Sequence, residues 1–405
     1  MSPAPARPEV GLSASMRRRG LTAVVASMAV TSLVYGVSFP LLSLVLDRHG
    51  VNASLIGLNT AVQSFSAFVV APLAPPLLAR FGPARLMVAA IATEVGLFLL
   101  LPTFPNVYAW FPLRFALGVA GSLVWVAGET WLNAVAGERS RGRVVALYTA
   151  ALSGGFAIGP VLLSVTGSEG WLPFLAAAAL MTVAALPAAY ARDAAPSLGG
   201  RRTTPLIAYA FLAPAAMLLN LAFAAADGAL MSFLPIYGLR LGIDEATALR
   251  LIAVMGFGGF ALQYPVGWLI DHADRRRVLI AGVVLVIVGC LAMPVLITMS
   301  GARWLFMIAF GGALTSLYSI SVVYLGERFR GNDLAAATTV FSVMWNLGAL
   351  AGPPLAGVAI DLWNPHGLPM AVAAIFVLYL PVAILSRRTA PTPGNNRNKR
   401  GQTPI

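Results

Sequence analysis

Long apolar stretches alternate with short polar breaks along almost the whole chain, and most of the breaks contain glycine, proline or arginine. A helix rises about 1.5 Å per residue, so roughly 20 apolar residues cross the ~30 Å hydrocarbon core of a bilayer. The pattern therefore predicts twelve membrane-spanning helices, at residues 21–46, 54–78, 84–101, 107–135, 144–165, 171–190, 206–239, 246–270, 278–298, 304–325, 334–360 and 368–385. The first stretch follows three arginines but is too long for the apolar part of a cleaved leader, so we expect it to be a span.

A short charged sequence occurs twice, at about half-chain spacing. Residues 137–142 read Gly-Glu-Arg-Ser-Arg-Gly, and residues 326–331 read Gly-Glu-Arg-Phe-Arg-Gly. Each copy precedes a Gly-Pro pair inside the next apolar stretch. Such a repeat is typical of transporters built from two similar membrane halves. We expect the halves at residues 20–190 and 205–388, a cytoplasmic linker at 191–204, and disordered cytoplasmic tails at 1–19 and 389–405.

The composition excludes an ordinary soluble domain. Hydrophobic residues make up 59% of the chain and charged residues 10%, whereas soluble domains carry about 25% charged residues. The net charge of +12 comes from arginines on one alternating set of loops, such as 17–19, 139–143 and 275–277. The opposite loops hold few arginines, chiefly Arg48, Arg240, Arg250 and Arg303. This asymmetry follows the positive-inside rule, places both termini in the cytoplasm and does not indicate a nucleic-acid partner.

Several segments resemble one known family. The run 267–277, Gly-Trp-Leu-Ile-Asp-His-Ala-Asp-Arg-Arg-Arg, resembles the cytoplasmic loop signature of the major facilitator superfamily. Arg114 followed by Gly118 resembles its span-four signature, and residues 155–160 resemble the span-five pattern of its antiporter branches. Residues 129–133, 138–143 and 146–148 resemble the YcaD-type branch of bacterial members. The resemblance covers about 21–385. It implies an all-α integral membrane fold, the major facilitator fold, with twelve transmembrane helices in two pseudo-symmetric six-helix halves.

The loop signature also implies a gate at the cytoplasmic end. In the superfamily the loop acid contacts a helix of the opposite half when that end is closed, so Asp271 would meet the start of the fifth span near Arg143. The first-half loop has Ala79 in place of the acid and Pro75 in place of the glycine, so the charged gate is one-sided. The candidate gate residues are Asp271, Arg275, Arg276, Arg277, Glu138, Arg141, Arg143, Glu327 and Arg330. The alternative is that these charges only fix the topology, because exposed ion pairs are individually weak.

Four ionisable residues lie inside the predicted spans, where charges are costly unless paired or hydrated: Glu94, Arg114, Glu129 and Asp227. The family places spans one, four, seven and ten around a central cavity, which implies that Arg114, Glu129 and Asp227 line it. We expect Arg114 to bind an anionic group or to set the protonation of a nearby carboxylate, and Asp227 or Glu129 to carry a proton. Glu94 lies in the peripheral third span, where proton coupling and a packing bond are both open. For the other three, the alternative is a structural ion pair that holds the helices in register.

Polar and aromatic side chains on the other candidate cavity helices supply a binding surface. They are Asn59, Gln63, Trp125, Gln263, Tyr318, Trp345 and Asn346. Helix packing or interfacial anchoring is the alternative for each of them. An apolar and aromatic cavity with few hydrogen-bonding groups suits an amphipathic organic molecule better than a hydrated sugar.

These features favour a secondary transporter in the bacterial inner membrane that exports a small organic, amphipathic solute in exchange for protons by alternating access. The alternatives are proton-coupled uptake of an organic anion, with Arg114 as its anchor, and an uncoupled facilitator. An alternative outside the transporters is a polytopic membrane receptor or enzyme. The sequence contains no phosphate-binding loop, no nucleophile elbow and no metal-ligand spacing of its histidines, so we expect no cofactor, no metal and no enzymatic activity. The expected partners are the substrate, protons and membrane lipids, with the chain as a monomer.

Overall fold

A computed structural model of the chain describes residues 13–104, 106–136, 141–194, 212–329 and 331–385. Within these ranges twelve helices are long and apolar enough to cross a membrane, which confirms the predicted number of spans. No strand occurs among them. The protein is therefore an all-α integral membrane protein.

Six helices form each half. The first half holds α1 (Ala14–Arg48), α2 (Ala53–Phe81), α3 (Pro83–Leu100), α4 (Val107–Val135), α5 (Arg141–Thr166) and α6 (Leu172–Tyr190), with short 3-10 turns η1 (Leu101–Thr103) and η3 (Arg192–Ala194). The second half holds α8 (Pro214–Arg240), α9 (Glu245–His272), α10 (Arg275–Leu296), α11 (Ala302–Arg328), α12 (Gly331–Leu362) and α13 (Gly367–Leu385). The first helix begins at Ala14, so its arginines belong to its first turns rather than to a tail. The seventh span is described only from Leu212, so the start predicted at 206 lies outside the described residues.

Local sequence explains where several helices begin. Ser13, Asn52 and Asp244 precede α1, α2 and α9, and each side chain accepts a hydrogen bond from a backbone N–H of the first turn. Gly50 and Gly242 occupy matching positions before α2 and α9. Both adopt positive φ, 75° and 78°, a conformation that glycine reaches without strain. The sequence repeat is therefore repeated in backbone geometry.

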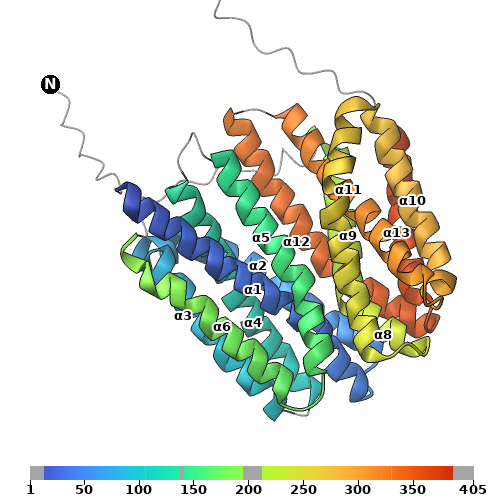
Figure 1. Ribbon diagram of the computed structural model, residues 1–405, viewed down its shortest axis with the longest axis horizontal. Helices are drawn as coiled ribbons and strands as arrows, with labels where there is room; N and C mark the ends of the chain where they lie inside the picture. Colours follow the sequence, from blue (N-terminus) through green and yellow to red (C-terminus); the bar gives the residue numbers. More distant parts are fainter. Residues whose placement is uncertain (1–12, 105, 137–140, 195–211, 330, 386–405) are drawn as a thin grey trace, which may run out of the picture.

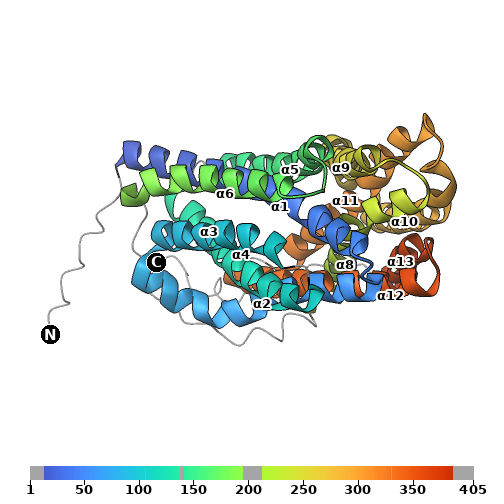
Figure 2. The ribbon, with the colours of Figure 1, turned by 90° about the horizontal axis from the view of Figure 1, so that it is seen from below.

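The halves meet along two seams and a central contact. In Figure 1, α3, α4 and α6 of the first half lie on the left, α9, α10, α11 and α13 of the second half lie on the right, and α5 and α12 lie between them in this view. Seen from below, α5 packs against α9 at one edge and α2 against α12 at the other (Figure 2), and α1 contacts α8 between these seams. Within the halves, α5 packs against α1 and α12 against α8. The equivalent glycines Gly159 and Gly352 face Gly36 and Ala225 there, so close that a β-carbon would clash with backbone. The Gly-Pro pattern thus serves helix packing in both halves.

Candidate functional site

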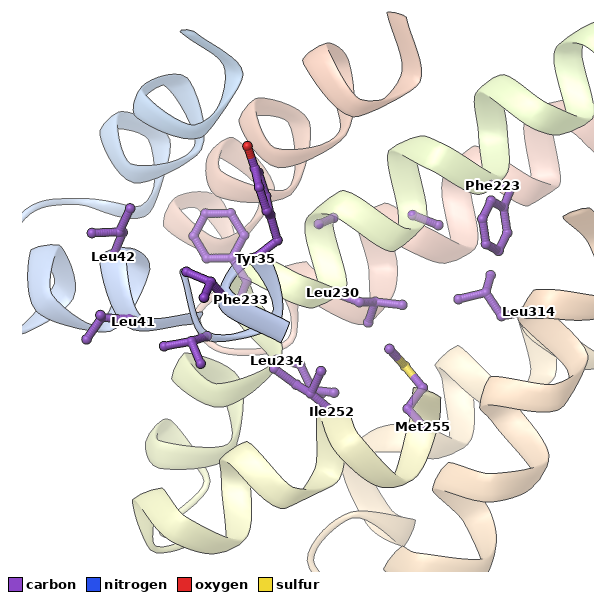
Figure 3. Close-up of a cluster of buried hydrophobic side chains, with 14 of the residues drawn as sticks. Tyr35, Leu41, Leu42, Phe223, Leu230, Phe233, Leu234, Ile252, Met255 and Leu314 are labelled. Atoms are coloured by element: carbon purple, nitrogen blue, oxygen red, sulfur yellow. The ribbon is translucent and has the colours of Figure 1, made fainter. Parts of the chain in front are cut away.

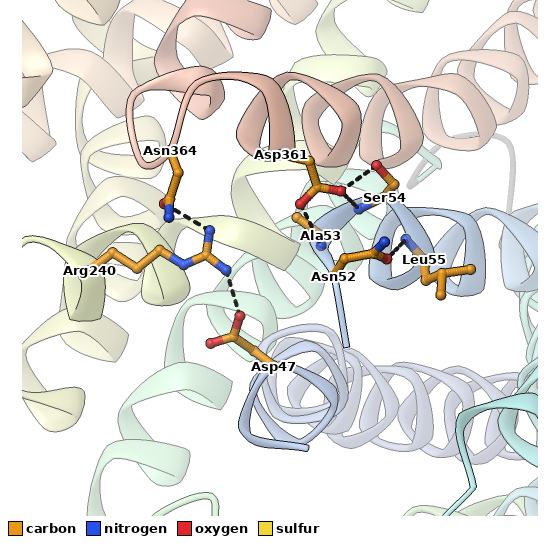
Figure 4. Close-up of polar contacts among 8 residues, drawn as sticks. All are labelled: Asp47, Asn52, Ala53, Ser54, Leu55, Arg240, Asp361 and Asn364. Atoms are coloured by element: carbon orange, nitrogen blue, oxygen red, sulfur yellow. Dashed lines mark hydrogen bonds and ion pairs between the residues drawn. The ribbon is translucent and has the colours of Figure 1, made fainter. Parts of the chain in front are cut away.

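One end of the helix bundle is held shut by polar contacts between the halves. Asp361, at the end of α12, accepts hydrogen bonds from the backbone nitrogens of Ala53 (3.0 Å) and Ser54 (2.8 Å), at the start of α2, and from the Ser54 hydroxyl (2.5 Å) (Figure 4). The positive end of the α2 dipole favours a carboxylate at this position. One seam is therefore fastened by an acid at a helix N-terminus.

The central contact and the second seam are fastened at the same end. Arg240 of α8 donates to Asp47 of α1 at 2.8 Å and to Asn364 at 3.0 Å (Figure 4). At the α5–α9 seam, Glu245 pairs with Arg48 of α1 and accepts from the backbone nitrogen of Ser168 at 3.0 Å. We call the contacts of Asp47, Arg48, Ser54, Arg240, Glu245 and Asp361 the polar belt. It joins α1, α2 and the α5–α6 loop to α8, α9 and α12.

An apolar layer lies near the polar belt. Leu41 and Leu42 of α1 and Phe233 and Leu234 of α8 are fully buried in a cluster that continues into α9 and α11 (Figure 3). Buried apolar contact of this kind excludes water and holds the two halves together. The closed end is therefore sealed by apolar packing as well as by charge.

The opposite, arginine-rich end carries the predicted gate residues. Asp271 and Arg143 are both exposed, and no ion pair joins them within the part of the chain that the structure describes. Arg275 instead pairs with Glu327 of α11, inside the second half. Arg276 donates to the backbone of Ile384, also in the second half, and Arg277 is exposed in the first turn of α10. Glu138 and Arg330 lie outside the described residues, as does the side chain of Arg141. The predicted gate thus remains a prediction, and it is not formed by Asp271 and Arg143 in this conformation.

Aromatic side chains gather in each half beside the helices that meet at the interface. In the first half, the Trp125 ring lies 6.4 Å from that of Phe156, stacked, and 6.3 Å from that of Tyr35, edge-on. In the second half, Tyr318 and Trp345 lie 5.6 Å apart, and each ring is 5.4 Å from that of Phe223. The predicted residues Trp125, Tyr318 and Trp345 therefore belong to two aromatic clusters, each built from several helices.

Two of the intramembrane carboxyls are not fully buried by protein. Glu129 of α4 is exposed, although it lies well inside its helix and interacts electrostatically with Tyr148 of α5 and Tyr318 of α11. Its carboxyl is therefore within electrostatic range of both halves. Asp227 of α8 is half-buried and has no hydrogen bond or ion pair to any described residue.

The other predicted polar residues are distributed differently. Arg114 is fully buried in the first half, where it donates to the Thr60 hydroxyl at 2.8 Å. Its remaining nitrogens Nε and Nη1 have no partner among the described residues. Asn59 is also fully buried. Gln263 of α9 is exposed, and Asn346 of α12 donates to the carbonyl of Ser342 in its own helix.

Glu94 makes a specific contact inside the first half. The hydroxyl of Tyr35, on α1, donates to Glu94 Oε1 at 2.8 Å, and both side chains are buried. Gln63 lies beside them, also buried. The peripheral third helix therefore aims its carboxyl inward, at a residue of the interfacial aromatic cluster.

Sequence reasoning assigns no functional role to Tyr35 or to the polar belt. It used Arg48 and Arg240 only to set the topology. The sequence does contain a sign of contacts between the halves: these arginines stand almost alone on their side of the membrane, at matching positions two residues before Gly50 and Gly242. Isolated charges at equivalent positions in both halves are candidates for contacts between the halves.

Two six-helix halves, fastened at one end and carrying polar and aromatic groups where they meet, define an integral membrane protein built for transport. The sequence matches the Major Facilitator Superfamily over residues 24–262 and 216–405, so the chain belongs to that family and is a transporter rather than an enzyme.

The curated relatives are transporters of unassigned substrate. The chain is 24% identical over 351 residues to the uncharacterized transporter YfkF of Bacillus subtilis, covering 82% of this chain and 87% of that one. It is 26% identical over 290 residues to the uncharacterized transporter YcaD of Escherichia fergusonii, covering 71% and 74%. The resemblance to YcaD-type members is thereby confirmed.

Solved structures share the fold. The nucleoside transporter NupG superposes with a TM-score of 0.75 at 12% identity, over 90% of this chain and 99% of that one. A bacterial homologue of the human lysosomal transporter Spinster, in an inward-facing and unoccupied conformation, superposes with a TM-score of 0.69 at 14% identity, over 92% and 96%. At these identities the likeness extends to the fold alone.

Proposed function

We propose that this transporter exports a small amphipathic organic solute in exchange for protons, by alternating access to a site between the halves. The observation that carries the proposal is Glu129. It is an exposed carboxyl inside a membrane-spanning helix, lies within electrostatic reach of Tyr318 in the other half and follows Trp125 by one helical turn. A carboxyl of this kind can exchange a proton with water and interact with a solute held between aromatic rings.

The charges at the interface favour a neutral or cationic solute over an anion. Glu129 is exposed and Asp227 is half-buried, whereas Arg114, the anchor expected for an organic anion, is fully buried in the first half. An anionic solute beside these carboxyls would be repelled, and a cationic one attracted.

We also infer the sidedness and the second gate. If the arginine-rich end faces the cytoplasm, as the positive-inside rule requires, the polar belt closes the external end and the conformation is inward-facing. Asp271 would then engage the start of α5 near Arg143 once the external end opens. Replacing Asp271 with Asn should lower transport and shift the inward/outward accessibility ratio. Unchanged transport with an unchanged ratio would remove the gate role.

The test is transport in proteoliposomes with an imposed pH gradient, screening amphipathic cations, neutral amphiphiles and organic anions in both directions. We expect gradient-driven movement of a cationic or neutral compound opposite to protons, and loss of gradient dependence in Glu129→Gln. The control is Asp193→Asn, which removes an exposed carboxyl of η3. Transport that ignores the gradient would indicate an uncoupled facilitator, and gradient-driven uptake of anions alone would overturn the proposed substrate and direction.

A further inference from the structure

A small enclosed cavity lies inside the first half, apart from the interface. Its volume is about 10 Å³, and it is lined by Tyr35, Ser38, Gln63, Glu94, Phe98 and Leu117. A cavity of about this size holds one water molecule or a particle of similar radius. Oxygen-bearing side chains from α1, α2 and α3 line it together with Phe98 and Leu117, so polar groups face a largely apolar space.

The hydrogen bonds around this cavity do not balance. Tyr35 donates to Glu94 Oε1, but Glu94 Oε2 and Gln63 Oε1 are buried and have no partner among the described residues. Both are acceptors as placed, and a buried acceptor without a donor costs about 1–3 kcal/mol. One water molecule in the cavity supplies two O–H groups and could satisfy both atoms.

Water alone leaves the charge of Glu94 uncompensated. No described cation forms an ion pair with Glu94. Of the helices packed around α3, α6 carries no charged residue and α2 carries only Arg80, near its far end. On α4 the charges are Arg114, which donates to the Thr60 hydroxyl, and Glu129, which faces the interface. Arg85 of α3 itself lies at its start, more than two turns from Glu94. Tyr35 is the titratable group in direct contact. An isolated buried carboxylate is strongly disfavoured, so a single positive charge must accompany it.

We propose that Tyr35, Ser38, Gln63 and Glu94 form a binding site for one monovalent cation. The cation is either a proton carried on Glu94, with a water molecule in the cavity, or Na⁺ in the cavity beside the ionised carboxylate. Either occupant neutralises Glu94. The lining oxygens are hard ligands of the kind that bind alkali and alkaline-earth cations, and a divalent ion would leave an excess charge in an enclosed space.

Tyr35 connects this site to the interface. Its hydroxyl binds Glu94, while its ring contacts Trp125, which stacks on Phe156 of α5. Figure 3 shows the Tyr35 hydroxyl pointing away from the labelled side chains of α8. Gly121 makes the Tyr35–Glu94 bond possible, because a β-carbon there would clash with the Tyr35 hydroxyl and lie 3.1 Å from Glu94 Oε1. Loss of the cation would change the Tyr35 bond and thereby the position of the aromatic cluster. This coupling role rests on the proposed transport function, whereas the cation site itself does not.

The experiment measures thermal unfolding of the purified full-length protein in detergent, so it needs no known substrate. One arm compares NaCl with choline chloride at fixed pH and ionic strength, and the other varies pH from mildly acidic to mildly alkaline without Na⁺. The variants are Glu94→Gln, Gln63→Leu and the control Asp193→Asn. A cation that binds only the folded protein raises its melting temperature in proportion to the logarithm of its concentration.

If the site takes Na⁺, NaCl raises the wild-type melting temperature by a few degrees, and Glu94→Gln abolishes the rise. If it takes a proton, the wild type loses stability relative to Glu94→Gln as pH increases, and Na⁺ has no effect. In either case Gln63→Leu weakens the response, and Asp193→Asn responds like the wild type. The inference is overturned if the responses of wild type and Glu94→Gln are equal in both arms. A positive result without gradient-driven transport would keep the cation site and refute the proposed coupling.

Discussion

The contact of Asp361 with the start of α2 is the sharpest test of the polar belt. Replacing Asp361 with Ala removes three hydrogen bonds that exist only while the α2–α12 seam is closed at this end. The carboxylate is exposed to water, so each bond is taken at the low end of the usual range, about 0.5–1 kcal/mol. The three together give about 2 kcal/mol. Since 1.4 kcal/mol corresponds to about a tenfold change, the ratio of closed to open conformers should fall about thirtyfold.

The conformer ratio can be measured with two spin labels at the closed end. Thr103, after α3, and Ser300, between α10 and α11, are exposed and belong to different halves. Cys290 is fully buried and should not compete for the label. Double electron–electron resonance on Thr103→Cys with Ser300→Cys should show one main distance in the parent protein. A longer distance should gain population when Asp361→Ala is added.

Two controls separate this gate effect from general loss of stability. Asp361→Asn keeps one acceptor oxygen and should give an intermediate distribution. Glu169→Gln removes an exposed carboxyl at the same end, whose ion pair with Arg48 (3.2 Å) stays within the first half, so it should leave the distribution unchanged. An unchanged distribution in Asp361→Ala would refute the reasoning that these bonds hold the seam closed.

Three further outcomes follow from named contacts. The double-mutant cycle of Asp47→Ala and Arg240→Ala should give a coupling of about 1 kcal/mol in the same distance measurement, because the pair is only partly shielded from water; additive effects would contradict a direct pair. Gly121→Ala should lower the melting temperature by several degrees or prevent folding, whereas Gly96→Ala, at a position on α3 that faces open space, should not. Equal losses of melting temperature in the two variants would contradict the close packing of α4 at Gly121. Hydrogen bonds from Thr247 at the start of α9 lower the pKa of Asp244. The stability that Asp244 contributes is therefore present above the ordinary carboxyl pKa and is lost as pH falls through the lowered pKa. Asp244→Ala should flatten the acid limb of a stability–pH curve.

The number and order of the spans follow from the sequence because each apolar stretch must bury its own backbone polar groups in lipid. The matching glycines before α2 and α9 likewise mark a backbone conformation that needs glycine. Local patterns of this kind are readable without a structure.

The contacts of the site are less accessible to such reasoning. That Glu94 and Arg114 lie inside spans is plain from the sequence, but which neighbours they meet depends on helix rotation and packing. The family resemblance implied that Arg114 and Glu129 of α4 both line the cavity, yet Arg114 is fully buried beside α2 and Glu129 is exposed. Tyr35 was missed because an aromatic residue in an apolar helix carries no signal until its partner, Glu94, is known.

The two seams of the closed end use equivalent positions with opposite chemistry. Ala53 and Glu245 each lie three residues after the matching glycines of the two halves, and Ser168 and Asp361 each lie nine residues after Gly159 and Gly352. At one seam the side chain of Glu245 accepts from the backbone at Ser168; at the other, the side chain of Asp361 accepts from the backbone at Ala53. In both seams the acid comes from the second half and the backbone donor from the first.

This asymmetry has an electrostatic reason. An acid at position 168 would face Glu245, and one at position 53 would face Asp361, so repeating both acids in the first half would set two carboxylates against each other at each seam. Of the two positions that face each other at a seam, only one can be acidic if the seam is to close. The loop signature shows the same division, with Asp271 in the second half and Ala79 in the first. The repeat thus governs the backbone of both halves, while both seam acids come from the second half, where neither faces another carboxylate.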